Sequence, residues 1–311
     1  MIRLRAAVIL LVASAVRIDA QQLAKTVRIS DDNEYFNFWI PPIDRPDNNY
    51  TQGLKVSWPS SRVPSFGRTI VCRKVAACGL NVEIGQEMYT PTFDSPTPEP
   101  GARPYAGFLY GRFALRAAQR HSSRAVTVVV GLTGEPSLAE TAQILFHRYF
   151  GFRRPQGWKY QLGAEPAFAV SAEQAWRIAP GAAGRFADFV PTVEVLAGTL
   201  RTSARAGGRI RIGSDLDHPW LASTVNRRFA VQGFVGGRVE RVAHDLFLDG
   251  STFEKSVSVD GEPVRSIWER GFRIGAGRAG FEYSVVSQSR EYRTGPAEHT
   301  YSSLSVMWLM R

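Results

Sequence analysis

The chain has 311 residues, of which 44% are hydrophobic and 21% are charged, and these proportions exclude a wholly disordered protein. Its 38 Lys and Arg residues exceed its 28 Asp and Glu residues by 10, so an anionic partner is expected. The mean hydropathy of -0.16 does not exclude a membrane protein, because a barrel that turns every second side chain into a wet lumen has a similar average.

An export signal is predicted at the N-terminus. Arg3 and Arg5 precede an apolar run at 6–15, and small residues near its end offer cleavage sites. The pattern predicts a signal peptide over residues 1–20, which leaves 21–311 as the mature domain. The apolar run is shorter than the roughly 20 residues that a membrane-spanning helix needs. No comparable run follows, so a mature protein that resides in a membrane would cross it as a β-barrel.

Two cysteines, Cys72 and Cys78, stand close together in the segment VCRKVAACG. An exported chain meets an oxidising compartment, so we expect a disulfide in the turn between the second and third strands. Two thiolates without a neighbouring histidine supply at most half of a zinc shell, which argues against a metal site there.

From about residue 27 onward, short segments of alternating apolar and polar residues are separated by Gly, Pro, Asn and Asp. In one segment Val231, Val235 and Val239 fall on one face. Gln232 and Glu240 fall on the other face, which is too polar for a dry core. The pattern predicts about a dozen strands, roughly at 27–39, 52–58, 80–89, 105–117, 125–132, 160–177, 186–199, 206–213, 229–246, 263–275, 279–292 and 300–310.

The fold class that follows is all-β, an antiparallel transmembrane β-barrel of about twelve strands with one extracellular-loop helix. An even number of strands returns both termini to one side, which in bacterial barrels is the periplasm. A soluble β-sandwich predicts the same alternation, but the export signal, the polar faces and the aromatic residues near strand ends favour the barrel. Those aromatic residues are Trp39, Trp58, Tyr89, Tyr110 and Trp308.

The segment SLAETAQILFHRYF, which begins at Ser137, breaks the strand pattern. Ser137 and Glu140 have the spacing of a capping box, and Gly151 stands where a helix would end, so a helix of about four turns is predicted. The helix follows the fifth strand and therefore belongs to the extracellular rim. Gln143 and His147 share a helix face with Glu140.

Five blocks stand out in residues 30–170. In chain order they read DDNEYFNF, NNYTQGLKVSW, QEMYTP, ARPYAGFLY and LAETAQILFHRYFGFRRPQGWKYQL. In this order and at this spacing, they resemble the successive blocks of the LpxR family of lipid A deacylases. Five ordered blocks are far more specific than any single motif.

The resemblance implies an outer-membrane barrel that hydrolyses the ester of the acyloxyacyl group at the 3′ position of lipid A, assisted by calcium. At the matching positions, His147 is similar to the family's general base, and Asn33, Thr51 and Gln143 are similar to further residues of the catalytic site. Glu34 stands where the family usually has Asp and is the candidate calcium ligand, because calcium prefers oxygen. A neutral imidazole can take a proton from water near neutral pH, which suits the role of His147.

The resemblance also implies lipopolysaccharide as the partner and an active site on the extracellular side of the outer membrane. We expect a monomer and no nucleic-acid partner. Arg153 and Arg154 follow the helix where a glutamate can occur in the family. They are candidates for binding lipid A phosphates, and a solvated loop cluster is an equal alternative.

Two other functions stay open at this point. The first is a catalytically silent outer-membrane barrel, either porin-like or structural, which would have no need to bring the helix residues beside Asn33, Glu34 and Thr51. The second is a soluble exported β-sandwich that binds a polyanion. Serine-hydrolase, nucleotide-binding and zinc-protease functions lack their motifs, since no GxSxG, phosphate loop or HExxH occurs.

Overall fold

The computed structural model describes residues 26–38, 49–60, 62–73, 77–92, 95–119, 121–214, 216, 219–220 and 229–309. The predicted signal peptide at 1–20 and Trp39 lie outside the described residues.

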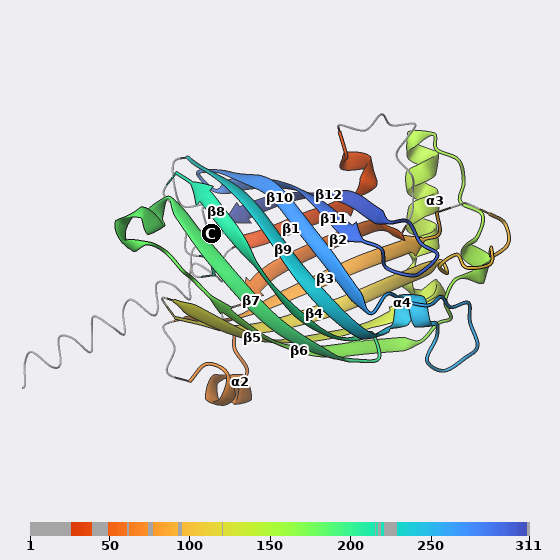
Figure 1. The fold of residues 1–311 in the computed structure, drawn as a ribbon, viewed down its shortest axis with the longest axis horizontal. Helices are drawn as coiled ribbons and strands as arrows, with labels where there is room; N and C mark the ends of the chain where they lie inside the picture. Colours follow the sequence, from red (N-terminus) through yellow and green to blue (C-terminus); the bar gives the residue numbers. More distant parts are fainter. Residues whose placement is uncertain are drawn as a thin grey trace, which may run out of the picture.

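Twelve antiparallel strands in the described part of the chain form a closed barrel (Figure 1). Each strand pairs with its neighbours along the chain, and β1 pairs with β12 to close the sheet. Closure leaves no strand edge with unpaired backbone groups. The strands are β1 (Thr26–Asn33), β2 (Asn49–Ser60), β3 (Ala77–Thr90), β4 (Ala106–Ala118), β5 (Ser122–Thr133), β6 (Pro166–Trp176), β7 (Ala187–Gly198), β8 (Arg201–Gly213), β9 (Ala230–Asp245), β10 (Val264–Ala276), β11 (Ala279–Ser289) and β12 (Glu298–Leu309).

The predicted strand number is confirmed, but several predicted strand ends are wrong by three residues or more, and those of the first and sixth strands differ the most. The first strand is predicted to reach residue 39, whereas β1 ends at Asn33 and a 3-10 helix, η1 (Glu34–Phe36), follows. The side-chain oxygen of Asn33 accepts a hydrogen bond from the Tyr35 backbone N–H, which turns the chain out of the strand. The sixth strand is predicted from residue 160, but the 3-10 helix η4 (Trp158–Tyr160) lies there and β6 begins later.

The two ends of the barrel carry different connections (Figure 1). We call the end at which β1 begins and β12 ends the terminal end, and the opposite end the loop end. The loop end carries η3 (Glu135–Ser137), α3 (Ala139–Phe150) and α4 (Leu246–Asp249), and the terminal end carries α2 (Ser65–Ile70) and η5 (Gly181–Arg185).

No described helix is long and apolar enough to cross a membrane.

Side chains alternate between the outside and the lumen, as the strand pattern predicts. Val235 and Val239 of β9 are 48% and 55% exposed, while Gln232 and Glu240 of the same strand are buried. Trp308 of β12 also faces outward. An apolar outer face over a polar interior is typical of a barrel that spans a membrane.

Ion pairs fill much of the lumen. Asp245 accepts hydrogen bonds from Arg201 and Arg265, both at 2.7 Å. Asp188 accepts a hydrogen bond of 2.8 Å from Arg211. A polar cavity of about 880 Å³ remains in the lumen. Because these buried charges are paired, the attraction between partners offsets the free-energy cost of removing them from water.

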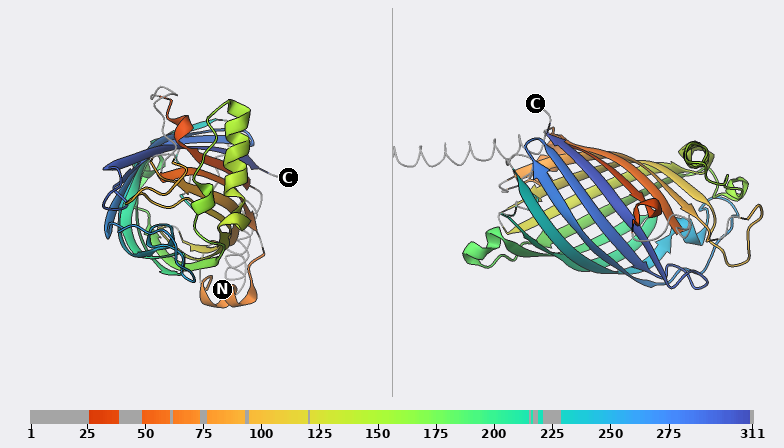
Figure 2. Two further views of the ribbon diagram at one scale, coloured as in Figure 1. Left: turned by 90° about the vertical axis from the view of Figure 1, so that its right-hand side faces the viewer. Right: turned by 90° about the horizontal axis from the view of Figure 1, so that it is seen from above.

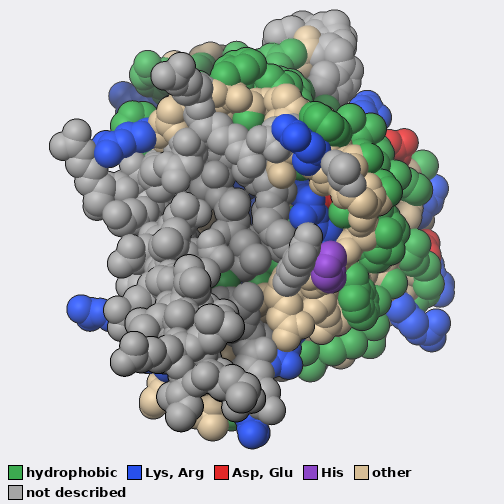
Figure 3. All heavy atoms as spheres, turned by 90° about the vertical axis from the view of Figure 1, so that its left-hand side faces the viewer, with side chains coloured by type: hydrophobic (Ala, Val, Ile, Leu, Met, Phe, Trp, Pro, Cys, Tyr) green, Lys and Arg blue, Asp and Glu red, His purple; other side chains and the backbone are tan. Residues whose placement is uncertain are grey.

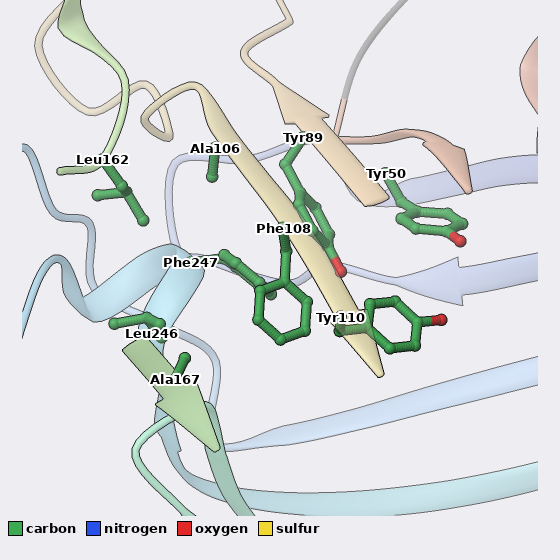
Figure 4. Close-up of a cluster of buried hydrophobic side chains, with 9 residues drawn as sticks. All are labelled: Tyr50, Tyr89, Ala106, Phe108, Tyr110, Leu162, Ala167, Leu246 and Phe247. Carbon is green, nitrogen blue, oxygen red and sulfur yellow. The ribbon is translucent and has the colours of Figure 1, made fainter. Parts of the chain in front are cut away.

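An aromatic cluster crosses the lumen at the loop end (Figure 4). Phe247 of α4 packs with its ring 4.4 Å from Tyr89 and 5.8 Å from Phe108. The Asp245 side chain accepts a hydrogen bond from the Phe247 backbone N–H, which turns the chain inward after β9. The structure corrects one prediction here: Tyr89 and Tyr110 belong to this buried cluster and not to a belt on the outside.

The predicted disulfide between Cys72 and Cys78 is present at the terminal end. Cys78 is the second residue of β3, so the bridge ties the segment after α2 to the start of that strand.

Figure 3 views the terminal end, where Lys and Arg side chains lie around the edge of the described surface.

Candidate active site on the outer wall

Helix α3 lies beside the barrel rim at the loop end (Figure 2). In β3 and β4 the side chains of Tyr89 and Phe108 face the lumen, so the neighbouring Met88 and Gly107 face outward. Met88 is 1% exposed and lies in a buried cluster with Ala139, the first residue of α3. The helix therefore covers the outer wall beside the rim.

The two ends of α3 confirm one predicted signal and correct another. Gly151 ends the helix with a φ of 73°, as predicted. The predicted capping box of Ser137 and Glu140 is wrong. The helix begins after Leu138, whose φ of 59° separates Ser137 from the first turn. The Ser137 hydroxyl instead donates to the Gly134 carbonyl oxygen at 2.5 Å.

Gly107 allows the close approach of α3 to β4. A Cβ atom at this position would lie 2.1 Å from Ser137 Oγ and 2.4 Å from the Ala139 side chain. Because overpacking of this kind costs about 1–3 kcal/mol, we expect Gly107→Ala to loosen the 134–165 connection while the barrel stays folded. Gly111→Ala is the matched control on the same strand face, since its nearest neighbour lies 3.4 Å away. Limited proteolysis followed by mass spectrometry measures the effect, and equal cleavage of both variants would contradict it.

Gln143 is buried in the middle of α3. Its Oε1 accepts a hydrogen bond of 2.6 Å from Trp158 Nε1. Trp158 is 1% exposed and packs beside Tyr105, with ring centroids 5.1 Å apart. Because the carbonyl end of the amide is directed at the indole, the amide nitrogen presents its two donors elsewhere. No sequence pattern marks Trp158, which sits inside the long block that contains the helix.

His147 lies one turn further along α3. Its Nδ1 is 2.5 Å from the carbonyl oxygen of Arg153. A carbonyl oxygen can only accept, so Nδ1 carries the proton and the lone pair of the neutral ring is on Nε2. The Phe152 ring packs 5.6 Å from the imidazole. The loop after α3 thus fixes the tautomer of His147, with Nε2 as its basic nitrogen.

The end of β1 lies close to the end of α3. The Tyr35 ring of η1 contacts the rings of Phe150 and Phe152 at 6.0 and 5.9 Å. Phe152 also contacts His147, so the helix residue and the segment after Asn33 share one aromatic neighbour. The structure therefore brings together two parts of the predicted site that are more than a hundred residues apart in sequence.

Asn33 and a second polar residue of β1 face outward beside this contact. Asp32 lines the lumen, so its neighbours Asp31 and Asn33 lie on the outer face. Asp31 Oδ1 accepts a hydrogen bond of 3.4 Å from the Gln52 side chain of β2. Ionisable residues on the lipid side of a barrel are costly and commonly functional. No sequence pattern marks Asp31, because the adjacent Asp31 and Asp32 lie on opposite faces and only the register shows which of them faces outward.

Thr51 reaches the same outer wall through a β-bulge. The register between β2 and β3 shifts between Tyr50 and Gln52. The hydroxyl oxygen of Thr51 lies 2.7 Å from that of Thr90, and both residues are buried. Thr90 lies on the same strand face as Met88, which packs under α3. Thr51 therefore lies on the outer wall near the N-terminal end of α3.

The structure does not bring Glu34 to the outer wall with Asn33 and Thr51, because its side chain points to the inner side. Its Oε1 lies 3.3 Å from Nδ1 of His299, and both side chains are buried. His299 precedes the lumen-lining Tyr301 by two residues, so it lies on the inner side of β12. The Nε2 atom of His299 lies 3.3 Å from the Tyr50 carbonyl oxygen. No sequence pattern connected His299 with Glu34, because the contact depends on closure of the barrel between β1 and β12.

The oxygen atoms at this rim are chemically suited to calcium. The described residues contain no group of three or more His, Cys, Asp or Glu side chains that could hold a metal ion. Calcium, however, accepts carboxylate and neutral oxygens and completes its shell with water or substrate, whereas zinc and copper favour nitrogen and sulfur. Asp31, Asn33 and Thr51 offer such oxygen atoms on the outer wall, and Glu34 offers a carboxylate on the inner side at the same rim.

The fold and the site define a class: a closed outer-membrane-type barrel with a polar site on its outer wall, beneath a rim helix. A model of the LpxR family, described as outer membrane protein LpxR, matches residues 4–310. The chain belongs to this family of outer-membrane lipid A deacylases.

One solved structure has the same fold over nearly the whole chain. LpxR from Salmonella typhimurium is 19% identical to this chain, with a TM-score of 0.76 over 92% of this chain and 100% of that one. The KdgM and NanC porins are each 6% identical with a TM-score of 0.40, covering 92% and 93% of this chain and 99% and 100% of their own chains. No curated protein sequence matches significantly.

Proposed function

We propose that the protein hydrolyses the 3′ acyloxyacyl ester of lipid A with a histidine base and calcium, on the extracellular side of the outer membrane. The observation that carries this proposal is the contact between the end of β1 and the end of α3 on the outer wall, through Tyr35, Phe150 and Phe152. A site on the outer wall meets lipids of the surrounding leaflet directly, which suits an ester inside a membrane lipid.

His147 is the proposed general base. Its proton on Nδ1 is directed at the Arg153 carbonyl oxygen, so Nε2 is the basic nitrogen of the ring. That nitrogen takes a proton from a water molecule, which then attacks the ester carbonyl carbon. When the tetrahedral intermediate collapses, the imidazolium returns the proton to the leaving alkoxide of the sugar.

The other residues stabilise charge that develops on the ester oxygen. Gln143 is oriented by Trp158 so that its amide nitrogen can donate. Asn33 and Thr51 add an amide and a hydroxyl on the same wall. Glu34, whose carboxylate contacts His299 on the inner side of β12, would hold calcium at this rim, and calcium when bound would supply positive charge near the ester oxygen.

Mass spectrometry of lipid A tests the proposed function directly. Purified protein incubated with lipid A and calcium should release the 3′ acyloxyacyl group, and cells that produce the protein should show the same loss. Lipid A of unchanged mass in both experiments would contradict the proposal, and the silent barrel would replace it.

The porin alternative makes an opposite prediction about conductance. Because the cluster around Phe247 crosses the lumen, we expect no steady ion current when the wild-type protein is inserted in a planar bilayer. Phe247→Ala removes the ring that packs on Tyr89 and should allow transient openings, whereas Phe189→Ala on the outer wall should not. A stable open channel in the wild type would favour the porin alternative.

A further inference from the structure

A chain of aromatic contacts leads from His147 across the outside of the barrel. Successive ring centroids lie between 5.6 and 6.2 Å apart. We call these residues the aromatic path. From the helix outward, its members are Phe152, Tyr35, Phe36, Phe38, Tyr283, Phe272 and Phe281.

The far end of the aromatic path lies on the outer wall. Glu282 lines the lumen, so Phe281 and Tyr283 on either side of it face outward. Arg273 lines the lumen in the same way, which turns Phe272 outward. Phe272 and Phe281 are 40% and 38% exposed. In a membrane these rings meet hydrocarbon.

The middle of the path is held over β11 and β12 by hydrogen bonds. The Tyr283 hydroxyl donates to the Phe36 carbonyl oxygen at 3.1 Å. The Ser302 hydroxyl donates to Asn37 Oδ1 at 2.7 Å. Phe38 then stacks on Tyr283, with ring centroids 6.0 Å apart, and is nevertheless 63% exposed. These hydrogen bonds therefore fix η1 and the residues after it in a position that places the Phe38 ring outside the barrel.

Burial in the fold does not account for this arrangement. The aromatic rings that stabilise the barrel interior, such as Tyr50 and Phe108, form a separate buried cluster. The path residues lie on the opposite side of the wall, and Phe38 in particular gains little burial from its stacking. A ligand that covers these rings would gain the apolar contact area that the fold leaves open.

We infer that the aromatic path binds an acyl chain of the lipid substrate and thereby favours substrates with long chains over those with short ones. This inference rests on the proposed function. The occupant follows from the two ends of the path, one beside the candidate base and the other on the membrane-facing wall. An acyl chain whose ester lies at His147 has to run from that site into the hydrocarbon, and the path follows that course.

The binding test uses purified full-length protein in detergent and a myristic acid analogue that carries a terminal diazirine. After irradiation, mass spectrometry locates the labelled peptides with and without excess unlabelled myristic acid. We expect the competitor to remove the label from peptides that contain Phe38 and Tyr283. Label on the peptide that contains Phe168, which is 50% exposed on β6, should not change, because it reports general contact with the detergent layer. Phe38→Ala should lower the displaceable label, and Phe168→Ala should not.

Hydrolysis provides a second readout. Two lipid A analogues carry either a myristoyl or a butyryl group as the cleavable chain. We expect Phe38→Ala to lower the ratio of kcat/KM for myristoyl over butyryl by about tenfold, while Phe168→Ala leaves the ratio as in the wild type. Displaceable labelling without hydrolysis of either analogue would support the path and overturn the proposed function. Label that myristic acid fails to displace, with an unchanged ratio in Phe38→Ala, would overturn the path.

Discussion

The His147→Ala variant is expected to release acyl chains from lipid A about 10²- to 10⁴-fold more slowly than the wild type, because that is the usual contribution of a general base. The imidazole is lost together with the basic nitrogen that the Arg153 carbonyl oxygen selects. The barrel should stay folded, since His147 lies on a helix outside the wall and takes no part in strand pairing. The measurement is the rate of fatty acid release from purified lipid A at saturating calcium.

A second histidine provides the matched control for this experiment. His121 lies in the turn between β4 and β5, at the terminal end of the barrel. His121→Ala should therefore hydrolyse lipid A at the wild-type rate. Heat modifiability on gel electrophoresis reports whether each variant forms the closed barrel. If folded His147→Ala protein released acyl chains as fast as the wild type, the proposed mechanism would be wrong.

The second large effect is expected at Glu34. Glu34→Gln removes the carboxylate charge proposed to hold calcium and should slow deacylation roughly 10²-fold, the usual cost of losing one electrostatic stabiliser in a transition state. Chelation of calcium should slow the wild type by a similar factor and have little further effect on the variant. Calcium binding is measured independently of activity by titration calorimetry, where the variant should show the weaker affinity.

Two further variants separate a metal role from a structural one. Glu34→Asp keeps the charge and restores the residue that the family usually has, so it should keep calcium binding and activity. Glu298→Gln removes a carboxylate at the same rim but from an exposed position, and should leave both unchanged. Loss of the His299 contact alone would disturb folding without changing the calcium dependence. A wild type that works equally well in chelator would disprove the calcium proposal and leave the test of His147 unaffected.

Local signals in the sequence predicted the barrel well. The period-2 alternation predicted the number of strands and the outward faces of β9 and β12, because side chains alternate between the two faces along a strand. Gly151 predicted the end of α3, since a left-handed residue there is a local requirement. The disulfide followed from two cysteines six residues apart.

The sequence did not predict the contacts between segments that are distant along the chain. Glu34 meets His299 only because β1 closes on β12, and no local pattern joins residues at opposite ends of the chain. Trp158 orients Gln143 only because the loop after α3 folds back along the helix. Tyr89 and Tyr110 were expected on the outside because their strand positions suggested a belt, but α4 brings Phe247 into the lumen to pack on them.

The sequence by itself therefore determined the class of fold, the family and the residue types available for chemistry. The tertiary structure decided which of those residues come together at the rim and which neighbours orient them. Alternation and helix signals depend on interactions within a few residues. Barrel closure and the packing of α3 against the wall depend on contacts between segments that only the complete sheet brings together.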